Sequence, residues 1–577
     1  MSIFDIFRRK KEIPAPWSKY YTDGQLKFKI PNITMYDQVK MMADKYPYEY
    51  AIEYFGKKYS YKKFMKKIDR AATAFKEMGI KKGDIVTLCM PNVPEVLYCL
   101  YGLNKIGAIA SMLHPLSAEE EIKESIVATK SKALVIMDMF YNKIENTIKS
   151  TGVKKVVFVC ASDSMNPLMK VGYFITKKHK YKRTPNRGLF MNYAKFMRTT
   201  WFKEPAKKLK GIGKNTPCII LNSGGTSGKP KHVVIQNRAF NLVNHQAHLV
   251  LKDMNVGSSC LGIMPNFHGF GLAISMHVMI GNGFKVHMVP QFDATKFDKL
   301  LKDTQPAFVI GVPTLFEALV NNQNVTDLDL SCVKYVVSGG DTLHKNLEDR
   351  VNEYLKSHNS NAVITQGYGM TEALSGICIG LGEVNKSGSV GVPLPGNYVK
   401  IIDPGTRKTV PYGEVGEICI HTRGLMLGYL NNESETNEAL QVHDDGHVWL
   451  HSGDLGMMDE DGFIFYKGRA KRMIICSGYN VYPAHVEEVI ESHPAVLQCS
   501  VVGVPHPYKQ EVPKAFIVLK EGFHGLFIKS EIKDYCKKNL AHYMVPYKFV
   551  YRKSLPKTKL AKVDFKSLQA DEGGDDY

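Results

Sequence analysis

The stretch "LNSGGTSGKPKHVV", residues 221–234, follows a short apolar run. It gathers three glycines, three hydroxyl residues and a lysine that can face an anion, namely Gly224, Gly225, Gly228, Ser223, Thr226, Ser227 and Lys231. Glycines let backbone N–H groups approach an anion closely, and hydroxyl groups and lysine add donors and charge. The stretch therefore predicts a phosphate-binding loop at the end of a strand. The alternative is a Gly/Ser-rich turn that holds no ligand.

The loop does not follow the pattern of the NTPase P-loop. That pattern places a glycine five residues before a Gly-Lys pair and a serine or threonine directly after it. Here Gly228-Lys229 is followed by Pro230, and Ser223 stands five residues before Gly228. The hydroxyl that would bind magnesium in a P-loop is therefore missing.

Buried strands and helices alternate on both sides of this loop. Apolar runs that end in Gly, Ser, Pro or Asn cover residues 84–90, 133–138, 154–160, 217–223, 307–313, 333–340 and 362–369, and a helix is expected over 93–109. This alternation is typical of an α/β protein with parallel or mixed sheets. Ligands of such folds lie beyond the carboxyl ends of the strands. We therefore expect the Gly-rich turns at 223–228, 338–340 and 367–369 to face one crevice.

The pattern changes after about residue 395. Short strands over 398–403, 416–422, 447–454 and 462–468 are separated by acidic glycine turns, which predicts an antiparallel hairpin region or small barrel. Next come a strand, a glycine turn and a helix that Pro483 can open. We predict a large N-terminal domain over 1–471 and a small mobile α+β domain over 472–577.

Composition places the chain among ordinary globular proteins. It has 577 residues, 44% of them hydrophobic and 23% charged, so more than one domain is expected. No apolar run has the length of a membrane span, and the first residues lack a signal-peptide pattern. The eleven cysteines show no CxxC spacing, which favours reduced thiols in the cytoplasm over disulfides or structural zinc.

The net charge of +20 suits an anionic partner. Residues 174–210 hold twelve Lys or Arg and one acid, with aromatic residues interleaved. If this segment is helical, Phe190, Tyr193, Met197 and Trp201 share one face, which predicts an element that lies on the inner face of a membrane. A solvated insertion is the alternative. Nucleic acid is not expected as a partner because no known nucleic-acid-binding motif accompanies the charge.

Four further stretches follow in order: "YGMTEA" at 368–373, "HSGDLG" at 451–456, "YKGRAKRMIICSGYNVYPAHVEEVI" at 466–490 and "LPKTKLAKVDFKSL" at 555–568. Together with the loop at 221–234, they resemble the adenylate-forming superfamily of acyl-CoA synthetases, adenylation domains and luciferases. The resemblance covers residues 35–568. It implies that a carboxylate attacks the α-phosphate of ATP and that the resulting acyl-adenylate reacts with a thiol. ATP, Mg²⁺ and coenzyme A would be required.

The resemblance also implies roles for the nucleotide-binding residues. The opening loop, with Lys231, would hold the β- and γ-phosphates, and His232 replaces a glycine of the family pattern. The residues at the adenine, the ribose, the α-phosphate and the magnesium ion would be Tyr368, Gly369, Thr371, Glu372, Gly339, Gly340, Asp341, Asp454 and Arg469. Tyr368 would stack on adenine and Asp454 would accept hydrogen bonds from the ribose. Glu372 would bind Mg²⁺ together with Thr226.

Lys562 matches the catalytic lysine of the family. It would bridge the acyl carboxylate and the α-phosphate. The family pattern P-K-T-x-S/T-G-K is altered here, because Leu560 replaces the hydroxyl residue and Ala561 replaces the glycine. The alternative is an ordinary surface lysine in a lysine-rich segment.

The second half-reaction is expected to use a different arrangement of the same chain. By resemblance, the C-terminal domain rotates about a hinge at Arg472 and withdraws Lys562. Ser477, Gly478 and Tyr479 would then line the channel for coenzyme A. The acyl pocket would include Phe267, His268 and Gly269, with a core histidine as the alternative for His268.

These features predict an acid–CoA ligase that acts on a medium- or long-chain fatty acid. An aryl-CoA ligase and an acyl-AMP ligase that loads a carrier protein are the alternative enzymes. An inactive scaffold that binds lipid or nucleotide is the alternative outside catalysis, because a fold alone does not ensure activity.

Overall fold

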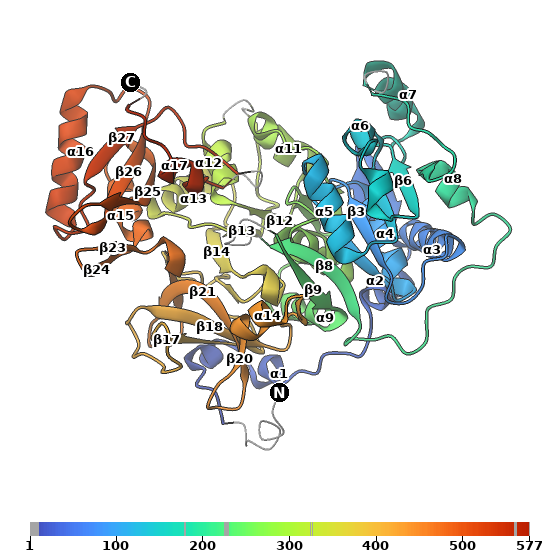
Figure 1. The fold of residues 1–577 in the computed structure, drawn as a ribbon, viewed down its shortest axis with the longest axis horizontal. Coiled ribbons are helices and arrows are strands. Elements are labelled where there is room, and N and C mark those ends of the chain that lie inside the picture. The colour runs from blue at the N-terminus through green and yellow to red at the C-terminus, as the bar shows by residue number, and fades with distance from the viewer. Residues whose placement is uncertain are drawn as a thin grey trace.

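The chain was analysed as a computed structural model that describes residues 11–177, 181–223, 230–322, 325, 327–558 and 562–575. Four sheets organise it (Figure 1). Two large sheets with their helices form the centre and one side, a third sheet lies below them, and the C-terminal sheet lies on the opposite side. The α/β class predicted from the sequence is thereby confirmed.

The sheet that carries the glycine-rich loop has eight strands in the order β19-β9-β8-β4-β3-β5-β6-β7. Its strands are β3 (Ile85–Cys89), β4 (Ile109–Met112), β5 (Ala133–Met137), β6 (Lys155–Val159), β7 (Phe190–Asn192), β8 (Pro217–Ser223), β9 (Lys231–Gln236) and β19 (Gly428–Tyr429). Neighbouring strands are parallel from β8 to β7, whereas β9 and β19 pair antiparallel. Their apolar side chains are buried because helices cover both faces, as in other parallel sheets.

The second large sheet has nine strands in the order β16-β15-β14-β13-β12-β10-β11-β1-β2. Its strands are β1 (Tyr50–Tyr54), β2 (Lys57–Ser60), β10 (Ser259–Gly262), β11 (Lys285–Met288), β12 (Phe308–Gly311), β13 (Tyr335–Gly339), β14 (Ile364–Tyr368), β15 (Cys378–Ile379) and β16 (Val392–Pro393). β12, β13 and β14 run parallel, with Gly339 beside Gly367. The glycine-rich ends of β13 and β14 therefore lie at one edge of the sheet.

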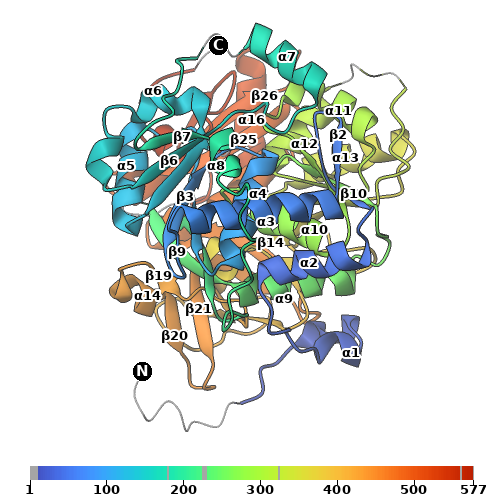
Figure 2. The ribbon, with the colours of Figure 1, turned by 90° about the vertical axis from the view of Figure 1, so that its right-hand side faces the viewer.

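Helices pack around and between the two large sheets (Figure 2). They are α2 (Met35–Lys45), α3 (Tyr61–Glu77), α4 (Pro94–Lys105), α5 (Glu119–Thr129), α6 (Tyr141–Ile144), α9 (Asn237–Val250), α10 (Met279–Gly281), α11 (Phe297–Thr304), α12 (Pro313–Val320) and α13 (Lys345–Ser357), with a short α1 (Asp23–Leu26) near the N-terminus. α4 begins at a proline, which fits the first turn because its missing N–H would have no partner there. All its residues are buried, so it forms part of the shared core.

The region after residue 395 is an antiparallel five-stranded sheet with the path β17-β18-β21-β20 and β22 paired to β21. Its strands are β17 (Asn397–Ile402), β18 (Gly416–Thr422), β20 (Leu440–Val442), β21 (Val448–Met458) and β22 (Ile464–Arg469), with α14 (Glu433–Ala439) beside them. The predicted hairpin region is thus present as a sheet.

The C-terminal part has its own sheet and its own hydrophobic core. It contains β23 (Ile474–Cys476), β24 (Tyr479–Val481), β25 (Val496–His506), β26 (Gln510–Leu519), β27 (Lys548–Tyr551), α15 (Pro483–Glu491), α16 (Leu526–Asn539) and α17 (Phe565–Gln569). β22 ends at Arg469 and β23 begins at Ile474, so the connection between the two parts is short. The domain boundary at residue 471 remains a prediction.

The basic segment 174–210 differs from the helix that its aromatic spacing predicted. Phe190 lies in β7, and only α8 (Tyr193–Arg198) is helical beyond it. Tyr193 and Met197 are buried, so they do not form a free apolar face. The exposed amphipathic element is instead α7 (Pro167–Thr176), which protrudes from the molecule (Figure 2). The prediction of one aromatic face over 190–201 was therefore wrong, because Tyr193 and Met197 pack in the core whereas Trp201 is exposed.

Candidate functional site

The two strands that flank the glycine-rich loop pair antiparallel and bring Ser223 opposite Lys231. The predicted phosphate-loop residues Gly224, Gly225, Thr226, Ser227 and Gly228 lie outside the described residues. Lys231 Nζ lies 2.7 Å from Glu435 Oε2 and 4.7 Å from the centre of the Tyr429 ring. The lysine thus points toward β19 and α14, which fix it by an ion pair and a cation–π contact.

Tyr429 connects this lysine to the predicted magnesium ligand. Its hydroxyl donates a hydrogen bond of 2.9 Å to Glu372 Oε1. Glu372 and Thr371 lie in a 3₁₀ turn directly after β14, and both are buried. A buried carboxylate with a single neutral donor retains free oxygen lone pairs, which is the arrangement that a hard cation requires.

The tight turn between β14 and this 3₁₀ turn depends on Gly369. A Cβ at Gly369 would lie 1.4 Å from the carbonyl oxygen of Ser375, so no other residue fits without moving the backbone. Leu374 and Ser375 have positive φ angles of 52° and 74°, which shows that the chain reverses sharply here. The turn holds Tyr368 and Glu372 on the same side of the β14 end.

Asp454 joins Tyr368 to Arg469. Tyr368 OH donates to Asp454 Oδ2 at 2.7 Å, and Arg469 Nε lies 2.9 Å from Asp454 Oδ1. Asp454 and Arg469 are cross-strand partners on β21 and β22, so the strand register places them together. Burial, the largest influence, raises the pKa of Asp454, while Arg469 acts to lower it. The carboxylate is thus held in place between Tyr368 and Arg469.

Lys562 also reaches this group. A Cβ built on Gly340 would lie 3.7 Å from Lys562 Nζ, so the lysine lies at the carboxyl end of β13. Burial lowers the pKa of Lys562, Asp341 opposes that effect, and Arg469 reinforces it. Lys562 is thus partly buried and lies among the nucleotide-site candidates, while its catalytic role remains a prediction.

His268 and Phe267 lie directly before a π-helix over Phe270–Val278. Burial, and secondarily the charge of Lys562, lowers the pKa of His268 to about 4, so the imidazole is neutral near pH 7. Its Nδ1 accepts a long hydrogen bond of 3.3 Å from the N–H of Phe270. The ring of Phe267 lies 4.3 Å from that of His114. These side chains form an uncharged wall beside Lys562.

Gly269 was predicted to leave room for an acyl chain. A Cβ there would instead lie 2.6 Å from Ser375 Oγ. Gly269 therefore allows close packing against the turn that follows Glu372. The structure describes packing at this position and does not show an acyl chain.

The hinge candidate Arg472 belongs to a 3₁₀ turn, Ala470–Arg472, between the two parts. Its guanidinium packs on Phe565 at 3.2 Å, and its Nη2 lies 3.5 Å from Glu487 Oε1. Ser477, Gly478 and Tyr479 are separate from the group around Asp454, since they form the β23–β24 turn. Tyr479 is exposed there and stacks on Tyr543.

Sequence patterns did not indicate Tyr429, Glu435 or Glu487. Each of the three contacts a predicted site residue that is distant in the sequence. The shortest separation is the 15 positions between Arg472 and Glu487. Tyr429 follows a glycine in a short apolar segment, which is a weak signal. The glutamates resemble other surface acids, so only their contacts reveal them.

Comparison with known proteins identifies the family. The AMP-binding enzyme family matches residues 39–430, and the AMP-binding enzyme C-terminal domain matches residues 485–562. The chain therefore belongs to the AMP-binding enzymes. The resemblance to the adenylate-forming superfamily is confirmed, and the acid–CoA ligases of this superfamily are the group to which the chain is related.

Individual relatives carry names that are more specific than the name of the family. A long-chain-fatty-acid–CoA ligase of Bacillus subtilis (strain 168) is 29% identical over 96% of this chain and 98% of its own length. A probable 4-coumarate–CoA ligase 2 of Dictyostelium discoideum is 31% identical over 82% of this chain and 83% of its own. The crystal structure of the anthranilate CoA ligase AuaEII in complex with anthranoyl-AMP shares the fold, with a TM-score of 0.81, 22% identity, and coverage of 94% of this chain and 98% of that one.

Proposed function

We propose that the protein is an ATP-dependent acid–CoA ligase whose reaction passes through an acyl-adenylate. The observation that carries the proposal is the convergence of Lys562, Asp454 and Arg469 beside the ends of β13 and β14. A transition state at the α-phosphate is rich in negative charge and needs fixed cations and donors. Lys562 and Arg469 supply cations at this point, and Asp454 and Tyr368 supply a fixed hydrogen-bonded pair.

In the first half-reaction, a carboxylate oxygen of the substrate attacks the α-phosphorus of ATP. A new P–O bond forms, the bond to the bridging oxygen of the β-phosphate breaks, and pyrophosphate leaves. Lys562 holds the carboxylate against the α-phosphate, Lys231 faces the leaving phosphates, and Thr371 donates to the α-phosphate. Gly339, Gly340, Asp341 and Gly369 border the adenine. The loop over residues 223–228, of which only Ser223 is described, is the proposed binding element for the β- and γ-phosphates.

Magnesium fits the donor set at Glu372. The carboxylate is buried and receives one neutral donor, Tyr429 OH, so its lone pairs are available to a hard cation. Glu372 and Thr226 would hold the ion. A bound ion would neutralise charge on the phosphate oxygens. Tyr429 orients the carboxylate toward that position.

In the second half-reaction, the thiol sulfur of coenzyme A attacks the acyl carbonyl, the bond to the phosphate oxygen breaks, and AMP leaves. The C-terminal part must move first, because Lys562 occupies the cleft in the present arrangement. The hinge is Arg472, and Ser477, Gly478 and Tyr479 line the thiol channel after rotation. The boundary between domains 1–471 and 472–577 follows from this hinge.

The substrate is a medium- or long-chain fatty acid. Two relatives named long-chain-fatty-acid–CoA ligase each match 96% of the chain. The neutral His268 and the ring of Phe267 give the wall beside Lys562 no charge to recognise a polar substituent. Aryl acids form the second candidate class, because relatives named 4-coumarate–CoA ligases are 30% and 31% identical.

Mass spectrometry of the acyl product tests the proposal. Purified protein is incubated with ATP, Mg²⁺ and CoA and with straight-chain, branched and aromatic acids in turn. We expect a CoA thioester together with AMP for straight-chain acids. Acyl transfer to a carrier protein without any CoA thioester would identify an acyl-AMP ligase. A complete lack of acid-dependent exchange between pyrophosphate and ATP would identify a non-catalytic scaffold.

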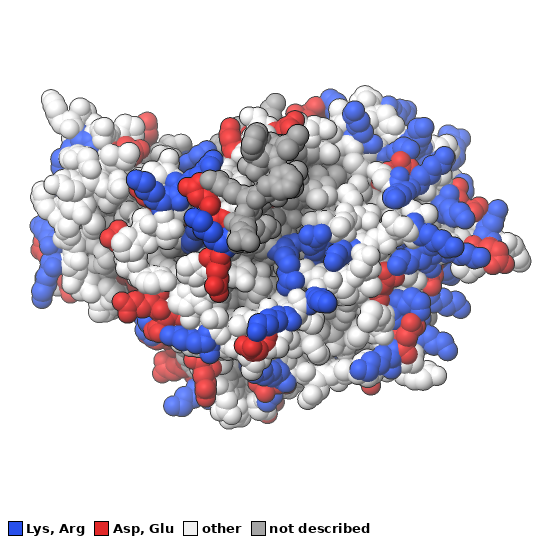
Figure 3. All heavy atoms as spheres, turned by 90° about the horizontal axis from the view of Figure 1, so that it is seen from below, with Lys and Arg blue, Asp and Glu red and all other residues white. Residues whose placement is uncertain are grey.

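The exposed helix α7 favours a location at a membrane surface. Leu168, Val171, Phe174 and Ile175 are all exposed, and no residue of α7 is buried. Lys170 and Lys177 accompany them. Further lysine and arginine side chains lie on the face seen from below, which is turned away from α7 (Figure 3). An apolar helix face with flanking lysines binds the interface of anionic lipids. None of the described helices has the length and hydropathy to cross a bilayer. The proposed location is therefore peripheral, at the cytoplasmic face.

A further inference from the structure

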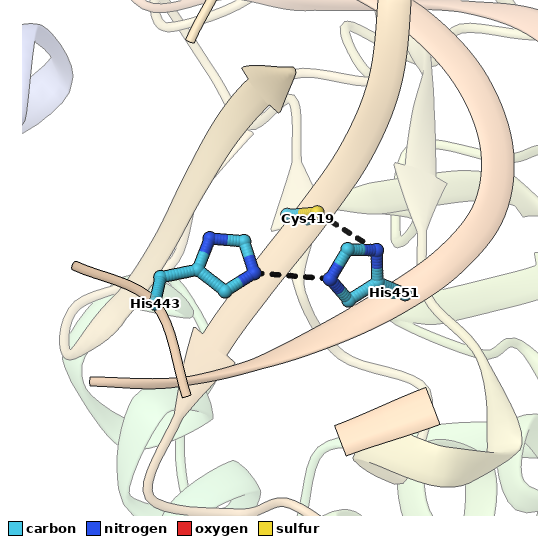
Figure 4. A group of neighbouring side chains, drawn as sticks. All are labelled: Cys419, His443 and His451. Carbon is cyan, nitrogen blue, oxygen red and sulfur yellow. Dashed lines mark hydrogen bonds between the residues drawn. The ribbon is translucent and has the colours of Figure 1, made fainter. Parts of the chain in front are cut away.

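A buried group of one cysteine and two histidines lies in the antiparallel sheet, away from the nucleotide-site candidates (Figure 4). Cys419 lies on β18 and His451 on β21, and strand register makes them cross-strand partners. His443 follows β20 in the hairpin that leads to β21. One ligand atom from each side chain lies within 4.8 Å of the others.

The two imidazoles face each other through their ring nitrogens. His443 Nε2 lies 3.0 Å from His451 Nε2, and Cys419 Sγ lies 3.8 Å from His451 Nδ1. Ligand atoms around tetrahedral zinc lie roughly 3.3–3.8 Å apart, given bond lengths of about 2.0–2.3 Å. The ligand atoms of the three side chains lie within 4.8 Å of one another, so they would have to approach by up to about 1 Å to hold an ion.

A carboxylate orients one of these rings. Glu417 Oε2 lies 3.0 Å from His451 Nδ1, so that nitrogen can donate to the carboxylate and leave Nε2 free as a ligand. Metal-bound histidines almost always have such a partner on the second nitrogen. Glu417 is itself fixed, since its Oε1 accepts a hydrogen bond of 3.1 Å from the N–H of Gly453.

The surroundings are also those of a ligand site. Cys419 and His443 are buried, whereas His451 and Glu417 retain a small exposed fraction, which gives an ion access from solvent. His443 Nδ1 is buried without a hydrogen-bond partner among the described residues. Burial of a polar nitrogen without a hydrogen-bond partner costs free energy of folding unless another interaction, such as metal binding by the group, compensates for it.

We propose that Cys419, His443 and His451 form a three-ligand zinc site that nothing in the proposed ligase reaction requires. The ligand set, one thiolate and two imidazoles, is one that Zn²⁺ accepts, with water as the fourth ligand. Binding releases the proton of the Cys419 thiol. The sequence argued against zinc because no CxxC pair exists, but the ligands lie 24 and 8 positions apart on three segments that the sheet brings together.

The site would fix the β20–β21 hairpin to β18. Asp454 lies three positions after His451 on the same strand and contacts Tyr368 and Arg469. An ion at the start of β21 therefore restrains the strand that carries Asp454. The role is structural, because the site itself contacts none of the residues proposed to bind ATP among those described.

Cobalt substitution provides the most direct test. The full-length protein is stripped with a chelator and then titrated with Co²⁺ or Zn²⁺. We expect one ion per chain, a near-ultraviolet band from thiolate-to-Co²⁺ charge transfer, and a higher unfolding temperature with Zn²⁺. Cys419→Ser should remove the band, and Glu417→Gln should weaken Zn²⁺ binding by about tenfold to a hundredfold.

The matched control is Cys260→Ser, which alters another buried strand cysteine outside the group. It should keep the band and the zinc-induced rise in unfolding temperature. The proposal is overturned if the unaltered protein binds no zinc, or if Cys419→Ser and His443→Ala bind it as well as the unaltered protein does. Metal binding is measured on the unaltered protein as well as on the variants. A variant that loses zinc only because it misfolds therefore does not decide the test by itself.

Discussion

At the residue scale, the site depends on charged groups that are buried beside one another. Asp454 is 2% exposed and is held by Tyr368 and Arg469, and Lys562 lies within electrostatic reach of the same carboxylate. Fixed charges in a site of low polarity interact more strongly than they would in water. Single substitutions here should therefore change catalysis more than they change folding.

Asp454→Asn should raise the KM for ATP by about tenfold to a hundredfold, because a hydrogen bond to a charged group contributes about 1.5–3 kcal/mol. Initial rates at varied ATP measure the effect. Asp461→Asn is the control, since Asp461 lies in the turn of the same hairpin and pairs with Lys19 at the surface. An unchanged KM in a normally folded Asp454→Asn protein would contradict the ribose role.

Lys562→Ala should reduce acid-dependent exchange between pyrophosphate and ATP by about a hundredfold to a thousandfold or more, because the α-phosphate loses a preorganised cation. Conversion of a supplied acyl-adenylate to the CoA thioester should persist, since the lysine leaves the cleft before that step. Lys566→Ala, an exposed lysine of α17, serves as the control. Equal loss of both half-reactions would argue against a lysine dedicated to adenylation.

At the scale of elements, strands position most of the site and one helix stands apart from it. Four strands lie beside the proposed nucleotide position, namely β13, β14, β21 and β22. The register between paired strands therefore decides which of their side chains meet. α7 contributes nothing to that group. Its apolar face is exposed and has no partner among the described residues, and contact of this face with lipid is a proposal.

Replacing Val171 and Phe174 together by serine should abolish sedimentation with anionic phospholipid vesicles without lowering the unfolding temperature, because both side chains are exposed. Tyr508→Ser is the matched control, since Tyr508 is an exposed aromatic residue of the C-terminal part, 93% accessible. If the double variant sediments with vesicles as the unaltered protein does, α7 is not the membrane contact.

At the scale of the whole molecule, the two parts meet over a set of acidic side chains. A cavity of about 130 Å³ lies between them, lined among others by Glu317, Asp341 and His344 on one side and Arg472, Glu487 and Glu491 on the other. Glu491 Oε2 lies 3.7 Å from His344 Nε2. Rotation of the C-terminal part would have to break these contacts, so their charge state influences which arrangement prevails.

Burial, followed by the charges of Glu317 and Asp341, raises the pKa of Glu491 to about 8 from an ordinary value of 4.5, although the N–H of Cys499 opposes this. Because the pKa of Glu491 is higher in the folded than in the unfolded protein, folding favours the protonated carboxyl. The contribution of Glu491 to the free energy of unfolding is therefore complete below pH 4.5 and is lost as pH rises to 8. The free energy of unfolding measured by urea titration of the unaltered protein should thus fall between pH 4.5 and 8, at most by about 1.4 kcal/mol per pH unit.

Glu491→Gln should flatten that dependence, because its side chain cannot ionise. Asp534→Asn, on the exposed surface of α16 in the same part of the chain, should leave it unchanged, because Asp534 pairs with Lys537 away from Glu491. Urea unfolding at several pH values measures the difference between the proteins. The same slope in Glu491→Gln and in the unaltered protein would show that Glu491 does not titrate at the interface.

The sequence by itself determined the order of the elements and indicated which residues to propose for the site. The run 217–223 predicted a strand that the structure has as β8, and the glycine-rich turns after 338 and 367 meet at one edge as expected, because parallel strands end together. The resemblance to the adenylate-forming superfamily singled out Tyr368, Asp454 and Lys562, whose roles remain predictions.

Only the tertiary structure decided which distant side chains become partners. Tyr429 meets Glu372 across 57 positions, and Tyr193 is buried although its spacing predicted an exposed face. Cys419, His443 and His451 likewise meet only because three segments pair in one sheet. Local patterns report periodicity and turns, whereas contacts between distant residues depend on how the sheets pack, and a single sequence does not encode that packing in any short window.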